Sequence, residues 1–366
     1  MKRTFSKAML VLALFFFPFF VSSCGQGPET GDSSKQGGNA SPAPTQIAPH
    51  NSLSGRDGLD GEVLAVKIDD TKFARPQIGL VDADLVYIEQ VEGGVTRLAA
   101  IYSSAYPTKI GPVRSARISD LELLAQFGKV AFAFSGAQRK LRPVIDSANL
   151  YNLGAEREGP SVYSRDQSRR PPWNMILNPQ ALFERAAKRN LTIAQAKNSG
   201  WSFKSKTKLG DKALSAEMKW PGARYEILWS QADSGWLINQ NGISKMDASG
   251  VPLLASTFVV QVVSITNSEY GDKFGEITPL ITSVGEGKAF VFRDGRVIKG
   301  TWSRFAPSSG TTFISDSGEE IPFKAGQIWF ALVAQEPAIT YPPEPSTSPS
   351  GQISGNSASA SPAPTK

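Results

Sequence analysis

The chain has 366 residues and a formal net charge of +6, and 20% of its residues are charged. This length is ample for two domains. The single cysteine and single histidine exclude disulfide bonds within one chain and leave almost no scope for zinc sites or histidine catalysis.

Residues 1–23 are predicted to be a signal peptide. Lys2, Arg3 and Lys7 precede an apolar run over 8–21, which is shorter than the ~20 residues of a membrane-spanning helix. The run ends in Val-Ser-Ser-Cys24, which looks like a bacterial lipobox, so Cys24 is the predicted lipidation site, acylated with palmitate-type chains. Removal of the signal peptide would lower the net charge to +3. So small a positive charge is weak evidence for nucleic-acid binding, and no nucleic-acid partner is expected.

Residues 24–58 are predicted to be a disordered, lipidated tether. The segment consists mainly of Gly, Ser, Pro, Gln and Asn and has little apolar surface to bury. His50 lies within it, so the folded part has no histidine for a general base or a metal ligand. We therefore expect a protein attached to the extracytoplasmic face of the cell membrane through its lipid.

Residues 59–203 are predicted to form an α/β or α+β domain around a central sheet. Continuous apolar runs are typical of strands buried on both faces, and helical periodicity alternates with them. Ser119 and Glu122 have the spacing of a capping box at a helix start, and Asn178 precedes a proline at the start of another helix. The expected strands are 62–69, 84–91, 96–102 and 129–134, and the expected helices include 120–127 and 179–189.

The stretch over 92–117 is the most distinctive part of this domain. Glu92-Gly-Gly joins two predicted strands as a tight hairpin, and the two glycines would also let a ligand approach the backbone. A loop then delivers Arg114 and Arg117 just before a helix, where backbone N–H groups favour a phosphate or carboxylate. The alternative is that these arginines only pair with Asp69, Glu92 or Asp120 and brace loops.

A predicted anion-binding site combines this stretch with two other loops. Basic side chains are concentrated between positions 109 and 189, and the loop over 163–174 is polar, rich in arginine and stiffened by two prolines. No cofactor or metal site is predicted, although Asp69, Asp70 and Asp84 could supply oxygen ligands. The candidate ligand-binding residues are Arg75, Glu92, Arg97, Arg114, Arg117, Asp166, Arg169 and Asn174.

Residues 220–335 are predicted to form a smaller, mostly antiparallel β domain. Short apolar strands are separated by Asn-Gly, Asp-Gly and Ser-Gly turns, with little helical periodicity. Trp302 and Trp329 could form a sugar-stacking platform, but large aromatic residues on strands are usually core residues. Residues 204–219 are the predicted connection, and residues 336–366 are a predicted disordered tail rich in Pro, Ser, Ala and Gly.

Several motifs together resemble the YerB-like lipoproteins, a bacterial family of unknown function. They include Arg-Pro-Gln-x-Gly-Leu from Arg75, Glu-Gly-Gly-x-Thr-Arg from Glu92 and Gly-Pro-Val-Arg-Ser-x-Arg ending at Arg117. The resemblance extends to Asp166-x-x-Arg-x-x-Pro-x-Asn174 and into the second domain, and it implies an extracytoplasmic lipoprotein of two domains. One departure is Trp173, where the family commonly has histidine.

The sequence supports three hypotheses. In the first, the arginine-rich site binds an anionic ligand of the cell envelope, such as a wall-polymer phosphate or a peptidoglycan carboxylate. In the second, the protein is a phosphoryl or glycosyl transferase or hydrolase in which Glu92 or Asp84 acts as acid or base. In the third, it is a non-catalytic partner that regulates another envelope enzyme, with its arginines buried in ion pairs.

Overall fold

A computed structural model describes residues 50–272 and 274–343, all within one compact unit of the chain. The predicted signal peptide, Cys24, most of the tether and residues 344–366 lie outside the described residues. The segment 50–58 was predicted to be tether, and that prediction is wrong. Asn51, Leu53 and Ser54 are buried: Leu53 packs into a hydrophobic core, and the Ser54 hydroxyl donates to Asp84 at 2.6 Å.

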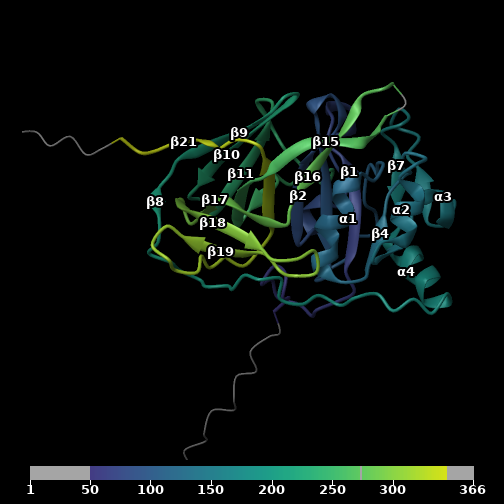
Figure 1. Cartoon of the computed structure of the whole chain (residues 1–366), viewed down its shortest axis with the longest axis horizontal. Helices are drawn as coiled ribbons and strands as arrows, with labels where there is room; N and C mark the ends of the chain where they lie inside the picture. The colour runs from purple at the N-terminus through teal and green to yellow at the C-terminus, as the bar shows by residue number, and fades with distance from the viewer. Residues whose placement is uncertain (1–49, 273, 344–366) are drawn as a thin grey trace, which may run out of the picture. The chain divides into compact units, whose positions relative to one another are not determined.

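An 11-stranded mixed sheet forms the centre of the molecule (Figure 1). β2 (Leu85–Gln90) and β3 (Thr96–Tyr102) pair antiparallel as the predicted hairpin, and β3 pairs with β1 (Leu64–Asp69). In spatial order the strands are β19 (Thr312–Ser315), β18 (Arg296–Arg304), β17 (Gly285–Arg293), β14 (Thr257–Val262), β20 (Ile328–Val333), β2, β3, β1, β4 (Val130–Ala133) and β5 (Leu150–Asn152), and β8 (Asp211–Lys212) pairs with β18.

This sheet is continuous across the two predicted domains. β20, from the second, pairs parallel with β2, from the first, in register Val86 with Trp329. β1 alternates between the two hydrophobic cores, because Val66 and Ile68 face one and Ala65 faces the other. The expectation of a central sheet followed by a mostly antiparallel region is confirmed, and the sheet makes both parts one body.

A second, 6-stranded sheet covers the first core. It comprises β12 (Ile243–Ser244), β11 (Gly235–Gln240), β10 (Ala223–Ser230), β9 (Ser215–Trp220), β21 (Ala338–Thr340) and β13 (Leu254–Ala255). β9 begins inside the predicted connection, and β21 begins inside the predicted tail, because backbone pairing orders segments with few apolar side chains. Trp302 and Trp329 are buried, which excludes them as an exposed stacking platform.

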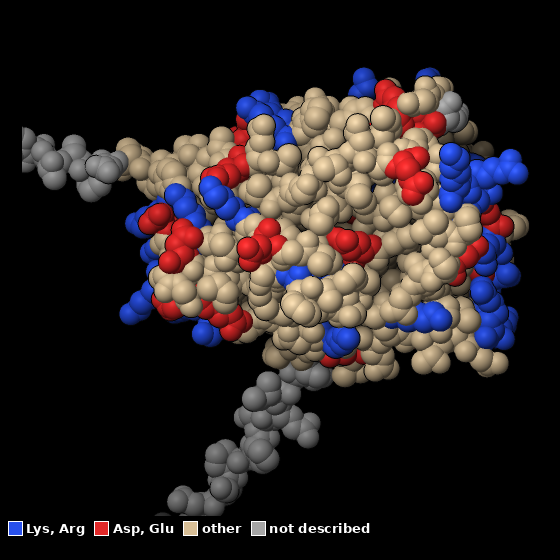
Figure 2. Space-filling view, viewed as in Figure 1, with Lys and Arg blue, Asp and Glu red and all other residues tan. Residues whose placement is uncertain are grey.

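The helices and the remaining strands surround the central sheet. Figure 1 places α2, α3 and α4 near the end of the sheet that carries β4, and Figure 2 shows Lys and Arg side chains along that edge. The helices are α1 (Ile118–Leu124), α2 (Arg142–Ser147), α3 (Ala155–Glu158) and α4 (Pro179–Lys188), with 3-10 turns at Lys72–Ala74, Leu80–Asp82, Glu92–Gly94 and Ala125–Phe127. Two hairpins complete the fold, β6 (Tyr163–Arg165) with β7 (Met175–Leu177), and β15 (Ser264–Gly271) with β16 (Ile277–Thr282).

The predicted capping box on α1 is wrong. The helix begins one residue before Ser119, and Asp120 accepts a hydrogen bond from the Arg117 backbone N–H at 2.6 Å. Ser119 and Glu122 instead bind the segment that contains and follows β16, where Glu122 accepts from the Ser283 N–H at 2.6 Å. The two residues therefore anchor a distant hairpin, and Asp120 provides the cap.

Candidate functional site

A cavity of about 850 Å³ lies where the turn after β2, the loop before α1 and the tip of the β15–β16 hairpin meet. Its volume is within the range of natural small-molecule sites. Four arginines line it together with two acids and several aromatic side chains. Its lining includes Glu92, Arg97, Arg114, Arg117, Arg139, Trp173, Tyr270, Asp272, Phe274 and Thr278.

Arg114 is held at the cavity by the end of β1. Its backbone N–H donates to the Lys67 carbonyl at 2.8 Å, so the loop pairs with the part of β1 that β4 does not reach. Its side chain lies against the buried Asp69 carboxylate, with 2.6 Å between Nε and Oδ2. Asp69 therefore balances the charge of Arg114, and removal of the arginine would leave a buried carboxylate uncompensated.

Arg117 is balanced in the same way by Glu92. The Arg117 Nε and Nη2 atoms donate to one carboxylate oxygen at 2.9 and 2.6 Å, and the Thr278 hydroxyl donates to the other. Burial alone would raise the pKa of Glu92, but the hydrogen bonds and charge of Arg117, helped by Thr278, bring it below the usual value. Glu92 is therefore a fixed anion that orients Arg117.

Arg97 is the exception among the three cations. It lies on β3, lines the cavity, and donates only to the Ser115 carbonyl, at 3.3 Å; within the described residues it has no carboxylate at ion-pair distance. Burial, followed by the like charges of Arg117 and Arg114, lowers the pKa of Arg97 to about 9, against the opposing charges of Asp69 and Glu92. This cation is short of a counterion, and an anion in the cavity would supply one.

Arg139 and Trp173 lie on the rim of the same cavity. Arg139 is exposed and forms no hydrogen bond or ion pair with the described residues. Trp173 is half-buried and packs on Phe73 with ring centroids 4.7 Å apart.

Asp272 accepts hydrogen bonds from the Phe274 and Glu276 backbone N–H groups at 2.8 and 3.0 Å, so its carboxylate stabilises the hairpin tip.

A buried charge cluster joins β1, β2 and α1 close to the cavity. The Lys67 ammonium contacts Glu89 and lies 2.6 Å from Asp120. All three side chains are almost fully buried. Burial first, then the nearby Asp120 charge, raises the pKa of Glu89 to about 8 despite Lys67, which favours the protonated form of this carboxyl group. The three side chains thus compensate one another within the protein.

Four predicted site residues do not line the cavity. Arg75 donates to the Asp70 carbonyl at 3.3 Å, while Arg169 pairs with Asp166 and donates to the Ala74 and Pro76 carbonyls, which ties the 163–174 loop to the loop after β1. Asn174 is buried and accepts from Arg165 at 2.7 Å. These four residues hold the loops around Trp173 in place. The predicted site residues therefore fall into two groups, those that line the cavity and those that brace the surrounding loops.

Asp84, the other catalytic candidate, also lies away from the cavity. It is fully buried and accepts five hydrogen bonds, from Ser54, Ser103 and Ser104.

Gly94 serves packing. A Cβ at this position would lie 2.5 Å from the Pro221 Cβ, so the close neighbour of Gly94 is protein and not a ligand. The sequence pattern showed that polar residues lie at strand ends, but it could not show which side chain or backbone group each of them contacts.

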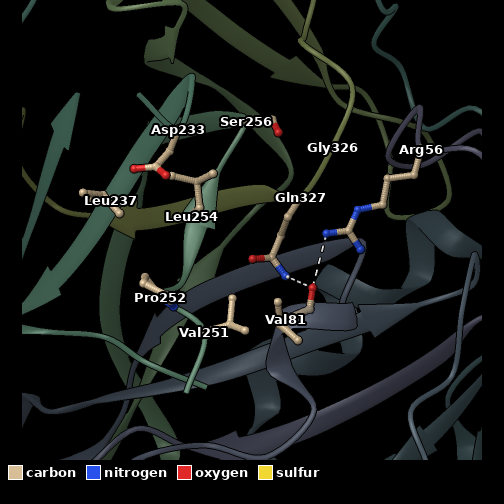
Figure 3. A pocket seen from close by; sticks show the side chains of 10 residues that line it. All are labelled: Arg56, Val81, Asp233, Leu237, Val251, Pro252, Leu254, Ser256, Gly326 and Gln327. Carbon is tan, nitrogen blue, oxygen red and sulfur yellow. Dashed lines mark hydrogen bonds between the residues drawn. The ribbon is translucent and has the colours of Figure 1, made fainter. Parts of the chain in front are cut away.

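A second cavity, of about 350 Å³, is less suited to a charged ligand. Most of its lining is apolar, with Val81, Leu237 and Leu254 among the residues drawn in Figure 3. Its one cation, Arg56, donates to the Val81 and Asp82 carbonyls, and Figure 3 shows Gln327 donating to the same Val81 oxygen. Arg56 and Gln327 are engaged with backbone carbonyls, so the arginine cavity is the stronger candidate site.

The described residues contain no cluster of three or more His, Cys, Asp or Glu side chains placed to hold a metal ion. Within 50–272 and 274–343, no helix has both the length and the apolar character needed to cross a bilayer.

The fold and the arginine cavity define a protein built on a mixed central sheet with a candidate anion site, and comparison with known proteins identifies its family. Residues 53–192 match the N-terminal domain, and residues 216–330 the C-terminal domain, of a protein family of unknown function, DUF3048. The chain belongs to this YerB-like family, which confirms the resemblance seen in its motifs.

Two comparisons with YerB of Bacillus subtilis extend over most of the chain. The candidate lipoprotein YerB of strain 168 is 24% identical over 334 residues, which is 89% of this chain and 95% of YerB. A crystal structure of the Bacillus subtilis YerB protein is similar with a TM-score of 0.69 at 21% identity, covering 80% of this chain and 99% of that one. At this identity the structural comparison establishes the shared fold alone.

Proposed function

We propose that this protein is a membrane-attached envelope lipoprotein that binds an anionic ligand in the arginine cavity. Attachment through a lipid is suggested by the likeness to the candidate lipoprotein YerB, and the lipobox-like sequence ending at Cys24 supplies the matching chemistry. The ligand is an anionic component of the cell envelope, either a wall-polymer phosphate or a peptidoglycan carboxylate, on the extracytoplasmic face.

The observation that carries this proposal is the state of Arg97. Arg114 and Arg117 already have carboxylate partners, whereas Arg97 is half-buried beside both and has none at ion-pair distance among the described residues. A purely structural role would favour a neutral residue there, because burying an uncompensated charge is costly. A bound anion would compensate Arg97 and would lie near Arg114 and Arg117, which line the same cavity.

The same contacts weigh against acid or base catalysis. Glu92 is ionised and held by Arg117 and Thr278, so it has neither a proton to give nor a free lone pair of high basicity. Asp84 is sealed among serine hydroxyl and backbone N–H groups away from the cavity. Binding is therefore the function that the geometry supports best, with interaction with an envelope enzyme as the alternative.

Binding of purified wall polymers and of peptidoglycan fragments tests this function. Arg139→Ala removes an exposed cavity arginine that holds no structural partner, and Arg170→Ala removes an exposed arginine of a nearby loop that does not line the cavity. We expect Arg139→Ala to weaken binding by roughly threefold to tenfold, as for one exposed charge contact, and Arg170→Ala to leave it unchanged. Equal binding by both variants, or no binding by the wild type, would overturn the proposal.

A further inference from the structure

We infer that the ligand of the arginine cavity is an anionic sugar, with its charged group at Arg97 and its ring against Trp173. This inference rests on the proposed function and specifies its ligand class. It covers glycosyl phosphates and carboxylate-bearing amino sugars alike, because both combine a sugar ring with one negative group.

The charges in the cavity set the charge of the ligand. Arg114 and Arg117 are matched by Asp69 and Glu92, and Asp272 is bound to the hairpin backbone. Of the four cavity arginines, the two without a carboxylate partner among the described residues are Arg97 on β3 and Arg139 at the rim. One or two negative charges on the ligand would balance them, as a phosphate ester or a carboxylate provides, whereas a polyanion would exceed what they can match.

The size of the cavity shows that the anion belongs to a larger molecule. A volume of about 850 Å³ greatly exceeds that of a phosphate or carboxylate group. Cavities of ~300–1,000 Å³ commonly enclose whole organic ligands. The ligand must therefore have a neutral body that occupies the space beside Arg97.

The wall of the cavity indicates what that body is. Trp173, Tyr270 and Phe274 contribute aromatic surface, and Gln138 and Ser115 contribute hydrogen-bonding groups beside it. Trp173 keeps part of its surface exposed and packs on Phe73, which is itself 57% exposed. A pyranose ring suits such a wall, because its C–H face packs on an aromatic ring while its hydroxyl groups bond to polar neighbours.

Trp173 thus acquires a role in specificity. The loop that carries it is fixed by Arg169, which donates to the Ala74 and Pro76 carbonyls at 3.0 and 2.7 Å. The same segment holds Phe73, so the two aromatic rings are positioned by one set of contacts. The bracing residues Arg169 and Asp166 therefore act on the ligand through Trp173 and need not touch it.

Calorimetric titration of the full chain in detergent tests the inference with four probes. They are N-acetylglucosamine 1-phosphate, N-acetylmuramic acid, inorganic phosphate and N-acetylglucosamine. We expect at least one of the two anionic sugars to bind roughly tenfold more tightly than both phosphate and the neutral sugar. The phosphate-bearing and carboxylate-bearing probes also separate the two sources of an anionic sugar.

Two substitutions of Trp173 assign the sugar contact. Trp173→Ala should weaken binding of the anionic sugar by roughly threefold to tenfold and leave phosphate binding unchanged, while Trp173→Phe should keep most of the affinity. Near-ultraviolet circular dichroism checks that both variants are folded. Anionic sugars that bind no better than phosphate, or an unchanged preference in Trp173→Ala, would overturn the sugar assignment.

The result for phosphate separates this inference from the proposed function. If phosphate binds to the wild type and not to Arg97→Met, but the sugar adds no affinity, the anion site stands and the sugar assignment fails. If Arg97→Met binds every anionic probe as the wild type does, the anion site fails and the sugar assignment fails with it.

Discussion

Arg97, Arg114 and Arg117 have the same charge, but their surroundings give them different roles. Removing Arg114 or Arg117 would strand the carboxylate of Asp69 or Glu92, at a cost of up to ~3–5 kcal/mol for a fully buried pair. Loss of binding in such variants would not distinguish a ligand contact from a damaged fold. Arg97 and Arg139 are the residues whose removal reports on the ligand, because no carboxylate depends on either.

At the residue scale, Glu89 gives a pH-dependent prediction. Its pKa is raised from 4.5 to about 8 in the folded protein by burial and by Asp120. The unfolded chain therefore releases this proton first, and the stabilising contribution of Glu89 is present below its unfolded pKa of about 4.5 and is lost as the pH rises through about 8.

Urea unfolding across this pH window, compared with Glu89→Gln, measures the effect. The glutamine imitates the protonated acid and does not titrate, so its stability should fall less than that of the wild type as the pH increases. Glu184→Gln on the exposed surface of α4 is the control and should follow the wild type. Parallel curves for Glu89→Gln and the wild type would contradict a proton held at Glu89.

At the level of elements, the sequence predicted local structure better than the contacts between distant segments. The hairpin of β2 and β3 was predicted correctly, because alternating apolar residues and two glycines specify it locally, and Gly93 and Gly94 both have positive φ. The β15–β16 hairpin was missed, since it is polar and largely exposed along β15 and is held by α1 and by Glu92. Tyr270, Asp272 and Thr278 were therefore absent from the predicted site.

Glu122 provides a test of how this hairpin is anchored. Its carboxylate accepts from the Ser283 N–H and hydroxyl and from the Val284 N–H at 2.6–3.1 Å. Glu122→Ala should cost about 1–3 kcal/mol by leaving these donors without a partner, and should speed amide exchange at Ser283 and Val284. The exposed Glu286→Ala on β17 is the control, and unchanged exchange in Glu122→Ala would contradict the anchor.

At the scale of the whole molecule, the sequence predicted an α/β part followed by a β-rich part. It did not predict that one continuous sheet joins the two parts. Each part has its own strand and turn signals, and two family models match them separately. β2 pairs parallel with β20. Just outside the two strands, the Gln327 side chain donates to the Leu80 carbonyl, 247 positions away, at 2.8 Å. The buried pair Lys245–Asp70 links the parts again at 2.6 Å.

This union predicts that the first part does not fold alone. A fragment of residues 50–203 lacks β20, so the edge of β2 and much apolar surface of both cores would be exposed. We expect it to be insoluble or to unfold without a cooperative transition, and to become ordered when co-expressed with residues 204–343. A fragment that is soluble, monomeric and cooperatively folded would show that the parts are independent domains.

The most direct test of the account is the thermal stability of the wild type and Arg97→Met with and without purified wall polymer or peptidoglycan fragments. Without ligand, Arg97→Met should be more stable by ~0.5–2 kcal/mol, because it removes an uncompensated charge. A ligand at ~100 times its Kd should stabilise the wild type by about 2.7 kcal/mol and Arg97→Met hardly at all. An Arg97→Met variant that is less stable than the wild type and is stabilised equally by ligand would contradict an anion site built around Arg97.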